Sequence, residues 1–330
     1  MSVVSLGGER RVSGVAVFAS SGSLLADRRY EYARAAAADA EHAAAVDLLQ
    51  QALEHAPRWA PAWFALGEAH ERLGAEAEAM QAFAEALACD PTDAQGAGLR
   101  LALLQGLAAP VMSAAYVRTL FDQYAGRFDT HLTGALAYCG PQLLTAALRQ
   151  VCRPRGRACH FDTVLDLGCG TGLMGKALVP NVGAMHGVDL SPAMLAEAAK
   201  TGLYASLNAA DMLAWLQTRP AAAADLVIAA DALVYCSDLA PLFAAAARAL
   251  DLKRGGLFAF TAQRHEGAGF ALGPDLRFAH AQAYLQDCAR AAGLQVALLQ
   301  AASTRRDAGR DVPGLVAVLT GVDAAPTNTS

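Results

Sequence analysis

Two hydrophobic patterns divide the chain. Up to about residue 110 the sequence is rich in Ala, Leu and Glu, a composition that favours helix. From residue 163 onward, short apolar runs alternate with helical stretches, which predicts strands separated by helices. The expected strands are 163–167, 184–190, 225–230, 257–261, 294–301 and 312–320. Helices between most of them predict a largely parallel α/β sheet that is covered on both faces.

The helical half repeats with a period of 34 residues, since Pro57 and Pro91 close successive units. That period is typical of helix–turn–helix repeats. The second unit resembles a tetratricopeptide repeat (TPR), and the unit at 24–57 matches it less fully. We expect Gly67 to let two antiparallel helices approach closely, with Phe83 filling the seam between them. The other matching residues of the second unit are Trp63, Leu66, His70, Ala79 and Ala86.

Two interpretations of the repeats stay open. Two clear units fall short of the three or so that a free-standing solenoid needs, which favours a helical brace on the other domain. A peptide-binding groove is the alternative. Residues 24–110 carry 13 acidic and 6 basic side chains, and Glu68 and Glu71 are expected on the concave side. A peptide or protein bound there would therefore be basic.

Composition narrows the classes of protein further. Hydrophobic residues make up 55% of the 330 residues without a run of about 18, so no transmembrane helix is expected. The seven cysteines are spaced neither as a disulfide framework nor as a zinc site, which predicts reduced thiols, a cytoplasmic location and no metal. Residues 111–330 carry 17 acidic and 18 basic side chains and lack the basic stripe that nucleic acid requires. We expect a disordered tail at 1–23, repeats at 24–110, a catalytic domain at 111–322 and a tail at 323–330.

A glycine-rich loop follows the first expected strand. Gly170, Gly172 and Gly175 fit the dinucleotide fingerprint, and Asp189 at the end of the next strand suits a ribose diol. Asp166 beside the loop separates the two candidate cofactors. Its carboxylate would repel a pyrophosphate but can hold the ammonium of an amino-acid-bearing cofactor. The loop therefore favours S-adenosyl-L-methionine over NAD.

On these motifs, residues 115–322 resemble the class I S-adenosylmethionine-dependent methyltransferases, whose fold is a doubly wound, Rossmann-like seven-stranded α/β sheet. With its all-α TPR domain, the whole chain resembles bacterial TPR-containing predicted methyltransferases whose catalytic half is similar to trans-aconitate methyltransferases. The resemblance implies that Asp189 binds the ribose and that Asp211 and Met212 lie at the adenine. The cofactor-binding residues that it implies are Asp166, Gly168, Cys169, Gly170, Thr171, Gly172, Asp189, Leu190, Met194, Asp211, Met212, Ala230 and Tyr124.

The segment before the first strand is part of this resemblance. In such enzymes it lies over the cofactor, which makes Tyr124, Phe128 and Leu132 candidates for a lid. The alternative is that these side chains only pack their helix on the sheet.

The acceptor site is expected after the fifth strand. Arg264 and Arg277 could pair with a carboxylate of the acceptor, and His280 or Tyr284 could orient or deprotonate it. Arg277 and His280 stand three apart and would share a face if this segment is helical. The alternative is that His280 caps a helix and that the arginines are solvated.

The expected function is methyl transfer from S-adenosyl-L-methionine to a small, carboxylate-bearing acceptor. Methyl transfer from a sulfonium depends mainly on positioning, so no catalytic base is assigned. The alternatives are a protein or peptide acceptor recruited by the repeats and a TPR adaptor without turnover.

Overall fold

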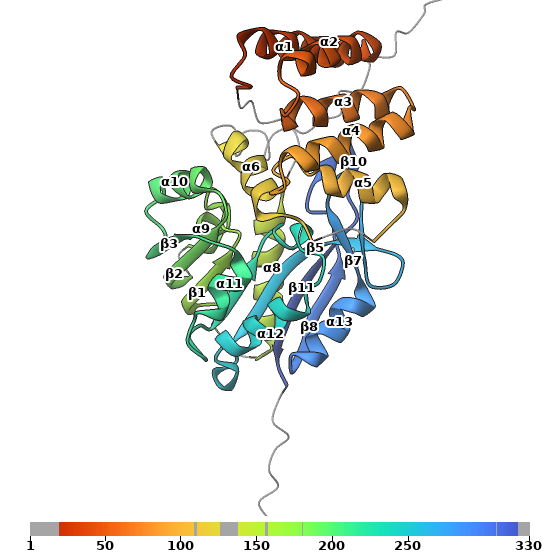
Figure 1. Ribbon diagram of the computed structural model, residues 1–330. Coiled ribbons are helices and arrows are strands. Elements are labelled where there is room, and N and C mark those ends of the chain that lie inside the picture. Colours follow the sequence, from red (N-terminus) through yellow and green to blue (C-terminus); the bar gives the residue numbers. More distant parts are fainter. Residues whose placement is uncertain are drawn as a thin grey trace, which may run out of the picture.

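The computed structural model describes residues 20–108, 111–125, 138–155, 158–179, 181–307 and 309–322. A layer of helices is stacked on one end of an α/β sheet domain (Figure 1). Within these described ranges, no helix combines the length and apolar character needed to cross a membrane. Of the expected tail at 1–23, residues 1–19 lie outside the described ranges. The end of that segment is ordered, because the Ser20 and Ser21 hydroxyls donate hydrogen bonds to Asp27.

The helical layer consists of two antiparallel helix pairs and one further helix. These are α1 Leu24–Ala38, α2 His42–His55, α3 Ala60–Arg72, α4 Glu76–Cys89 and α5 Ala97–Gln105. The ring of Phe83 on α4 lies against Gly67 on α3, and a Cβ atom added to Gly67 would stand 2.6 Å from that ring. Only glycine allows this approach without displacing the ring, so the expected part of Gly67 and Phe83 in the seam is confirmed.

Helix α5 joins the repeats to the rest of the chain. Leu99 on α5 is buried in an apolar cluster with Val117 of the next helix, α6 Ala114–Tyr124, and with Phe278 of the sheet domain. Gly96 lies against the ring of Tyr116 on α6. A Cβ atom added to Gly96 would stand 2.8 Å from that ring. The repeats are therefore packed on the sheet domain through α5 and α6.

The sheet has the order β3-β2-β1-β4-β5-β11-β8. Its strands are β1 Phe161–Leu167, β2 Val182–Asp189, β3 Ser206–Ala209, β4 Leu226–Ala229, β5 Leu257–His265, β8 Leu294–Ala301 and β11 Gly314–Gly321. Strands β1 to β5 are parallel to one another, whereas β11 is antiparallel to both of its neighbours, β5 and β8. This order confirms the expected doubly wound, Rossmann-like sheet of seven strands.

Two short strands extend the sheet beyond that expectation. They are β6 Phe270–Leu272 and β7 Phe278–Ala281, and β7 runs parallel to β5. A separate hairpin follows β8, formed by β9 Arg306–Asp307 and β10 Arg310–Asp311. The helical interpretation of Arg277 and His280 is therefore wrong, because His280 lies on β7 and Arg277 precedes it.

Alternate strand residues bury opposite faces of the sheet, as the pleat requires. Leu165 and Val227 pack on one face under the helices that precede and follow β4, whereas Val164 and Ile228 pack on the other face. Besides α6, the described helices of the domain are α8 Gly140–Cys152, α9 Leu173–Leu178, α10 Pro192–Lys200, α11 Met212–Gln217, α12 Ala240–Ala249 and α13 Gln282–Ala291. The same part of the chain contains short 3-10 helices, η3 Arg153–Arg155, η4 Leu233–Tyr235 and η5 Leu252–Arg254.

Candidate functional site

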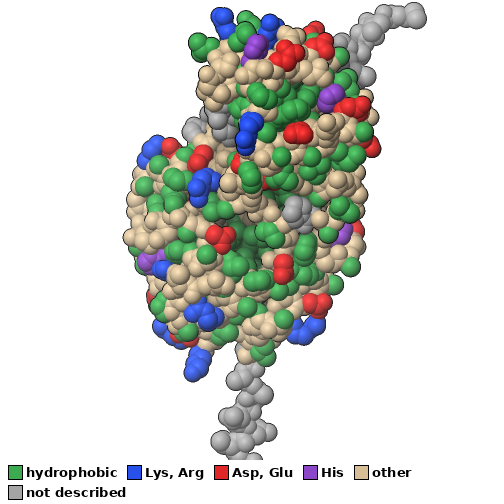
Figure 2. All heavy atoms as spheres, viewed as in Figure 1, with side chains coloured by type: hydrophobic (Ala, Val, Ile, Leu, Met, Phe, Trp, Pro, Cys, Tyr) green, Lys and Arg blue, Asp and Glu red, His purple; other side chains and the backbone are tan. Residues whose placement is uncertain are grey.

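A cavity of about 170 Å³ opens at the carboxyl ends of β1, β2 and β4. Strand β1 pairs with β2 on one side and with β4 on the other, and open α/β sheets bind ligands where the strand order reverses in this way. Hydrophobic side chains gather near the junction of this domain with the helical layer (Figure 2). Ten of the expected cofactor residues line the cavity: Asp166, Gly168, Cys169, Gly170, Thr171, Asp189, Leu190, Asp211, Met212 and Ala230.

Asp166 is the most deeply buried acid of the cavity, with an exposed fraction of 1%. Its Oδ2 atom accepts a hydrogen bond of 2.7 Å from the Tyr204 hydroxyl. Its Oδ1 atom is buried and has no hydrogen-bond partner among the described residues. Burial raises the pKa of Asp166 to about 7, and the nearby Asp189 charge adds to the rise, against the hydrogen bond from Tyr204. A cationic group placed at Oδ1 would satisfy this oxygen and favour the ionised form.

Asp189 ties the glycine-rich loop to the next helix. Its Oδ2 accepts from the Gly170 backbone N–H at 2.9 Å, and its Oδ1 accepts from the Ser191 N–H at 2.9 Å. Gly168 has a φ of +66°, and an added Cβ there would stand 2.6 Å from that of Ala232. A glycine at this position therefore allows the loop to pack closely against Ala232 in a left-handed conformation.

Two of the described cofactor candidates do not line the cavity. Met194 is fully buried on α10, and Gly172 ends the loop with a φ of +87° at the start of α9. The side chain of Tyr124 lies outside the described part of the structure, as do Phe128 and Leu132. Asp211, which does line the cavity, also caps α11, because its Oδ1 accepts from the Ala214 N–H at 2.8 Å.

Helix α6 forms part of the cavity wall. Val117 and Phe121 on this helix line it. The Ser191 hydroxyl donates a 2.5 Å hydrogen bond to Asp122, and Arg118 Nε donates to the Leu190 carbonyl at 3.2 Å. The helix is thus fastened to the loop that follows β2.

Among the described residues that line the cavity, Arg277 carries the one positively charged side chain. Its Nη1 lies 3.2 Å from Asp231 Oδ2, and its guanidinium carbon lies 5.5 Å from the centre of the Tyr235 ring. Asp231 adopts a left-handed φ of +57°, and its backbone N–H donates to the Thr261 hydroxyl at 2.8 Å. A strained non-glycine residue is typical of functional sites.

The other expected acceptor residues lie away from the cavity. Arg264 is exposed and pairs with Glu266 at 3.1 Å. Tyr284 donates to Asp238 Oδ1 at 2.7 Å and accepts from the Leu239 N–H at 2.8 Å. The structure therefore places neither side chain at a substrate in this cavity.

His280 is also absent from the cavity wall. It is fully buried, and its Nε2 lies 3.0 Å from the Cys236 carbonyl oxygen and 3.1 Å from that of Ser237. Burial lowers the pKa of His280 to about 4, so the ring is neutral at pH 7. It does not cap a helix, since α13 begins after Ala281. Its contacts hold the loop that follows η4.

Several side chains at the Arg277 end of the cavity were not expected from the sequence. Tyr138, Tyr235 and Asp231 line the cavity, and Arg305 stands behind Asp231. Asp231 and Tyr235 lie in the segment that follows β4, so their position after the carboxyl end of this strand was the available signal. Tyr138 and Arg305 lie far from the motifs in the sequence, so no signal pointed to them.

The acidic pair of the repeats is not free. Arg100 on α5 lies 3.6 Å from Glu68 and 3.7 Å from Glu71, both on α3. Burial raises the pKa of Glu68 to about 7. The expected acidic surface for a basic peptide is therefore partly neutralised from within the chain.

Comparison with known proteins gives the same two parts. Residues 164–256 match the family described as a methyltransferase domain, and residues 60–93 match the tetratricopeptide repeat. The chain is similar to Methyltransferase-like protein 27 of Homo sapiens, with 36% identity over 27% of this chain and 35% of that protein. It is also similar to trans-aconitate 2-methyltransferase of Pseudomonas aeruginosa, with 38% identity over 24% of this chain and 29% of that protein. The chain thus spans about a third of the length of these curated relatives.

Among solved structures, the fold is similar to that of 1,6-didemethyltoxoflavin-N1-methyltransferase of Burkholderia thailandensis, with S-adenosylhomocysteine bound. The TM-score is 0.51 at 19% identity, and the match covers 66% of this chain and 92% of that one. The sheet domain therefore shares the fold of that protein and contains the segment that matches the methyltransferase domain family, and the helical layer contains the segment that matches the tetratricopeptide repeat.

Proposed function

We propose that this chain transfers a methyl group from S-adenosyl-L-methionine to a small, carboxylate-bearing acceptor. The unpartnered, buried Oδ1 atom of Asp166 carries the proposal. This oxygen needs a hydrogen-bond donor, and the ammonium of the cofactor's methionine part is a donor of opposite charge. A pyrophosphate at the same place would bring a second negative charge to a buried carboxylate.

The remaining cavity residues fit the same cofactor. Backbone of the loop from Gly168 to Gly172 can approach the methionine part, and Asp189 offers carboxylate oxygens to the ribose hydroxyls. Asp211 and Met212 line the end assigned to adenine by the resemblance. The matches to methyltransferase relatives support this assignment.

The cofactor supplies a methyl group already activated on a sulfonium, so the residues of this chain act by binding, orienting and excluding water. Phe121, Tyr138 and Tyr235 give the acceptor end apolar walls. A carboxylate acceptor is ionised at neutral pH and needs no general base. This agrees with the position of His280, which is buried away from the cavity.

The acceptor class follows from Arg277. Its guanidinium has five N–H donors. Only its Nη1 atom is given to Asp231 among the described residues, so donors remain for a carboxylate of the acceptor. The nearby Tyr235 ring holds the guanidinium in place. Arg277 would thereby fix the acceptor relative to the methyl group.

We further propose that the repeats serve as a brace. The apolar cluster around Leu99 and Val117 ties them to the cavity wall at Phe121. Recruitment of a basic peptide is less favoured by the contacts of Arg100 with Glu68 and Glu71. The following experiment must distinguish a protein acceptor from a small one.

The test is product detection with methyl-labelled S-adenosyl-L-methionine and full-length protein. One arm contains a panel of small carboxylic acids that includes trans-aconitate, and the other contains a protein extract. The proposal predicts label in a methyl ester of an acid of the first arm. Label found only in protein would contradict the small acceptor and would indicate a protein acceptor recruited by the repeats.

A further inference from the structure

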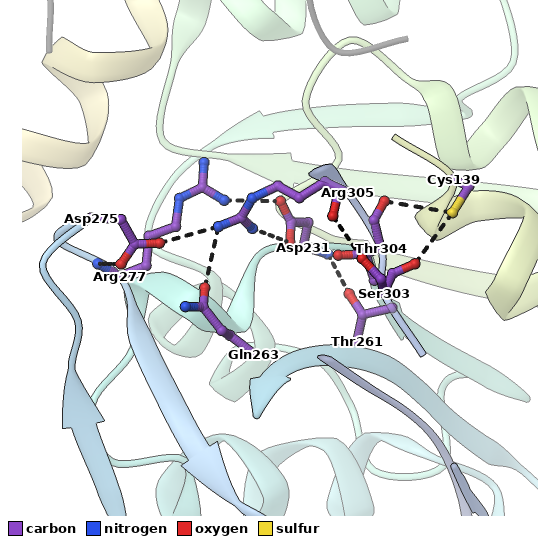
Figure 3. A network of polar contacts seen from close by, with 9 residues as sticks. All are labelled: Cys139, Asp231, Thr261, Gln263, Asp275, Arg277, Ser303, Thr304 and Arg305. Carbon is purple, nitrogen blue, oxygen red and sulfur yellow. Dashed lines mark hydrogen bonds and ion pairs between the residues drawn. The ribbon is translucent and has the colours of Figure 1, made fainter. Parts of the chain in front are cut away.

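Arg305 is a buried arginine that stands outside the cavity wall and contacts three segments around it. Its side chain is 7% exposed. Nη1 lies 3.3 Å from Asp231 Oδ1, and Nη2 lies 3.2 Å from Gln263 Oε1 and 3.3 Å from Asp275 Oδ2. Its partners thus follow β4, lie on β5 and precede β7, so one guanidinium joins three parts of the acceptor end (Figure 3).

The backbone of Arg305 is fixed as well. Its carbonyl oxygen accepts from the Ser303 hydroxyl at 2.6 Å and from the Val312 N–H at 3.1 Å. The adjacent Thr304 carbonyl accepts from the Cys139 N–H at 2.9 Å, next to the cavity residue Tyr138. The guanidinium therefore extends from a rigid segment rather than from a free loop end.

Asp231 is shared between two arginines. Arg277 contacts its Oδ2 atom and Arg305 contacts its Oδ1 atom, and Figure 3 shows the two guanidinium groups directed at the same carboxylate. Without Arg305, both oxygens of Asp231 could accept from Arg277 in a bidentate ion pair, which is the favoured geometry for arginine. That pair would draw Arg277 away from the cavity and cancel its charge.

We propose that Arg305 is a positioning residue for the acceptor. By occupying Oδ1 of Asp231, it limits Arg277 to a single contact with that carboxylate and leaves the remaining donors of Arg277 for a carboxylate of the substrate. The proposal rests on the proposed function for the class of acceptor. It does not depend on that function for the geometry of the three side chains.

The test compares Arg305→Gln, Arg305→Lys and Arg306→Gln in full-length protein. Arg306 is the matched control, because it is the next residue and its exposed side chain contacts Asp311 and the Gly309 carbonyl rather than any of the three partners of Arg305. Calorimetry with S-adenosylhomocysteine reports whether each variant is folded and holds the cofactor. Kinetics with the best acid of the carboxylate panel report the acceptor side.

We expect Arg305→Gln to raise KM for the acid and lower kcat/KM by roughly tenfold to a hundredfold, with cofactor affinity within about twofold of wild type. Arg305→Lys should rescue only part of the loss, because an ammonium cannot span three partners. Arg306→Gln should behave as wild type. In a double-mutant cycle, Arg305→Gln should add little once Asp231→Asn is present, since it acts through Asp231.

Crystal structures of wild type and Arg305→Gln with S-adenosylhomocysteine give a second readout that needs no acceptor. We expect Arg277 to turn onto both oxygens of Asp231 in the variant. An unchanged Arg277, or fully additive effects in the cycle, would overturn the inference while leaving the proposed function intact. If wild type methylates none of the acids, the carboxylate acceptor fails, and the position of Arg277 in the two structures decides the inference alone.

Discussion

The Tyr204 hydroxyl donates a 2.7 Å hydrogen bond to Oδ2 of Asp166 and leaves Oδ1 of the same carboxylate buried at the cavity. One oxygen is thus held by the protein, and the other is available to a ligand. Since burial raises the pKa of Asp166 to about 7, the carboxylate is half protonated near neutral pH without a ligand. Cofactor binding is therefore expected to be coupled to release of a proton.

The affinity for S-adenosylhomocysteine should fall as pH is lowered through 7. The ligand ammonium favours ionised Asp166, so the pKa is lower in the complex than in the free protein, and affinity loses up to about tenfold per pH unit below 7. Asp166→Asn should bind weakly with a flat profile. Asp162→Asn is the control, because that exposed acid lies at the other end of β1. Calorimetric titrations across this pH range measure the effect, and a profile equally steep in Asp166→Asn would assign it to another group.

Tyr204→Phe should shift this profile to higher pH. The hydroxyl is the group that lowers the pKa of Asp166, whereas the ring packs at Gly172 and Gly175 and remains in the variant. Loss of the hydrogen bond should also reduce the free energy of unfolding by about 1 kcal/mol. The measurement is the pH midpoint of S-adenosylhomocysteine affinity. An unchanged midpoint would mean that Tyr204 does not tune Asp166.

Asp189→Ala should weaken S-adenosylhomocysteine binding by about 1 to 3 kcal/mol. The substitution removes the acceptor proposed for the ribose hydroxyls and also frees the N–H groups of Gly170 and Ser191. Isothermal titration measures the loss, and far-UV circular dichroism checks that the fold persists. Unaltered affinity in a folded variant would place the ribose elsewhere.

Leu99→Ala tests the brace. Leu99 is 1% exposed between the repeats and the sheet domain, so its truncation should lower the free energy of unfolding by about 2 to 5 kcal/mol. It should also loosen α6 and weaken cofactor binding. Leu107→Ala is the matched control, because Leu107 is 64% exposed. Thermal unfolding with and without S-adenosylhomocysteine compares the two, and equal midpoints for both variants would remove the brace.

Local motifs predicted that Asp166, Asp189 and the glycine-rich loop would lie together at one edge of the sheet. Asp166 and Asp189 end adjacent parallel strands, and the order of strands brings such ends together. The acceptor side depends on contacts over long separations. Arg305 meets Asp231 across 74 residues, and no periodicity or spacing encodes that contact.

The error at 278–281 has a different cause. A strand of four residues is too short for a period to separate it from the start of a helix. Its identity is set by pairing with β5, which a single sequence does not reveal. His280 was expected at the substrate because its segment follows the fifth strand, whereas its burial on β7 gives it a structural position.

Calorimetry of the full-length protein with S-adenosylhomocysteine and, separately, with NAD tests the central claim most directly. We predict micromolar affinity for S-adenosylhomocysteine, about −8 kcal/mol, and far weaker binding of NAD. Tight binding of NAD without binding of S-adenosylhomocysteine would contradict it.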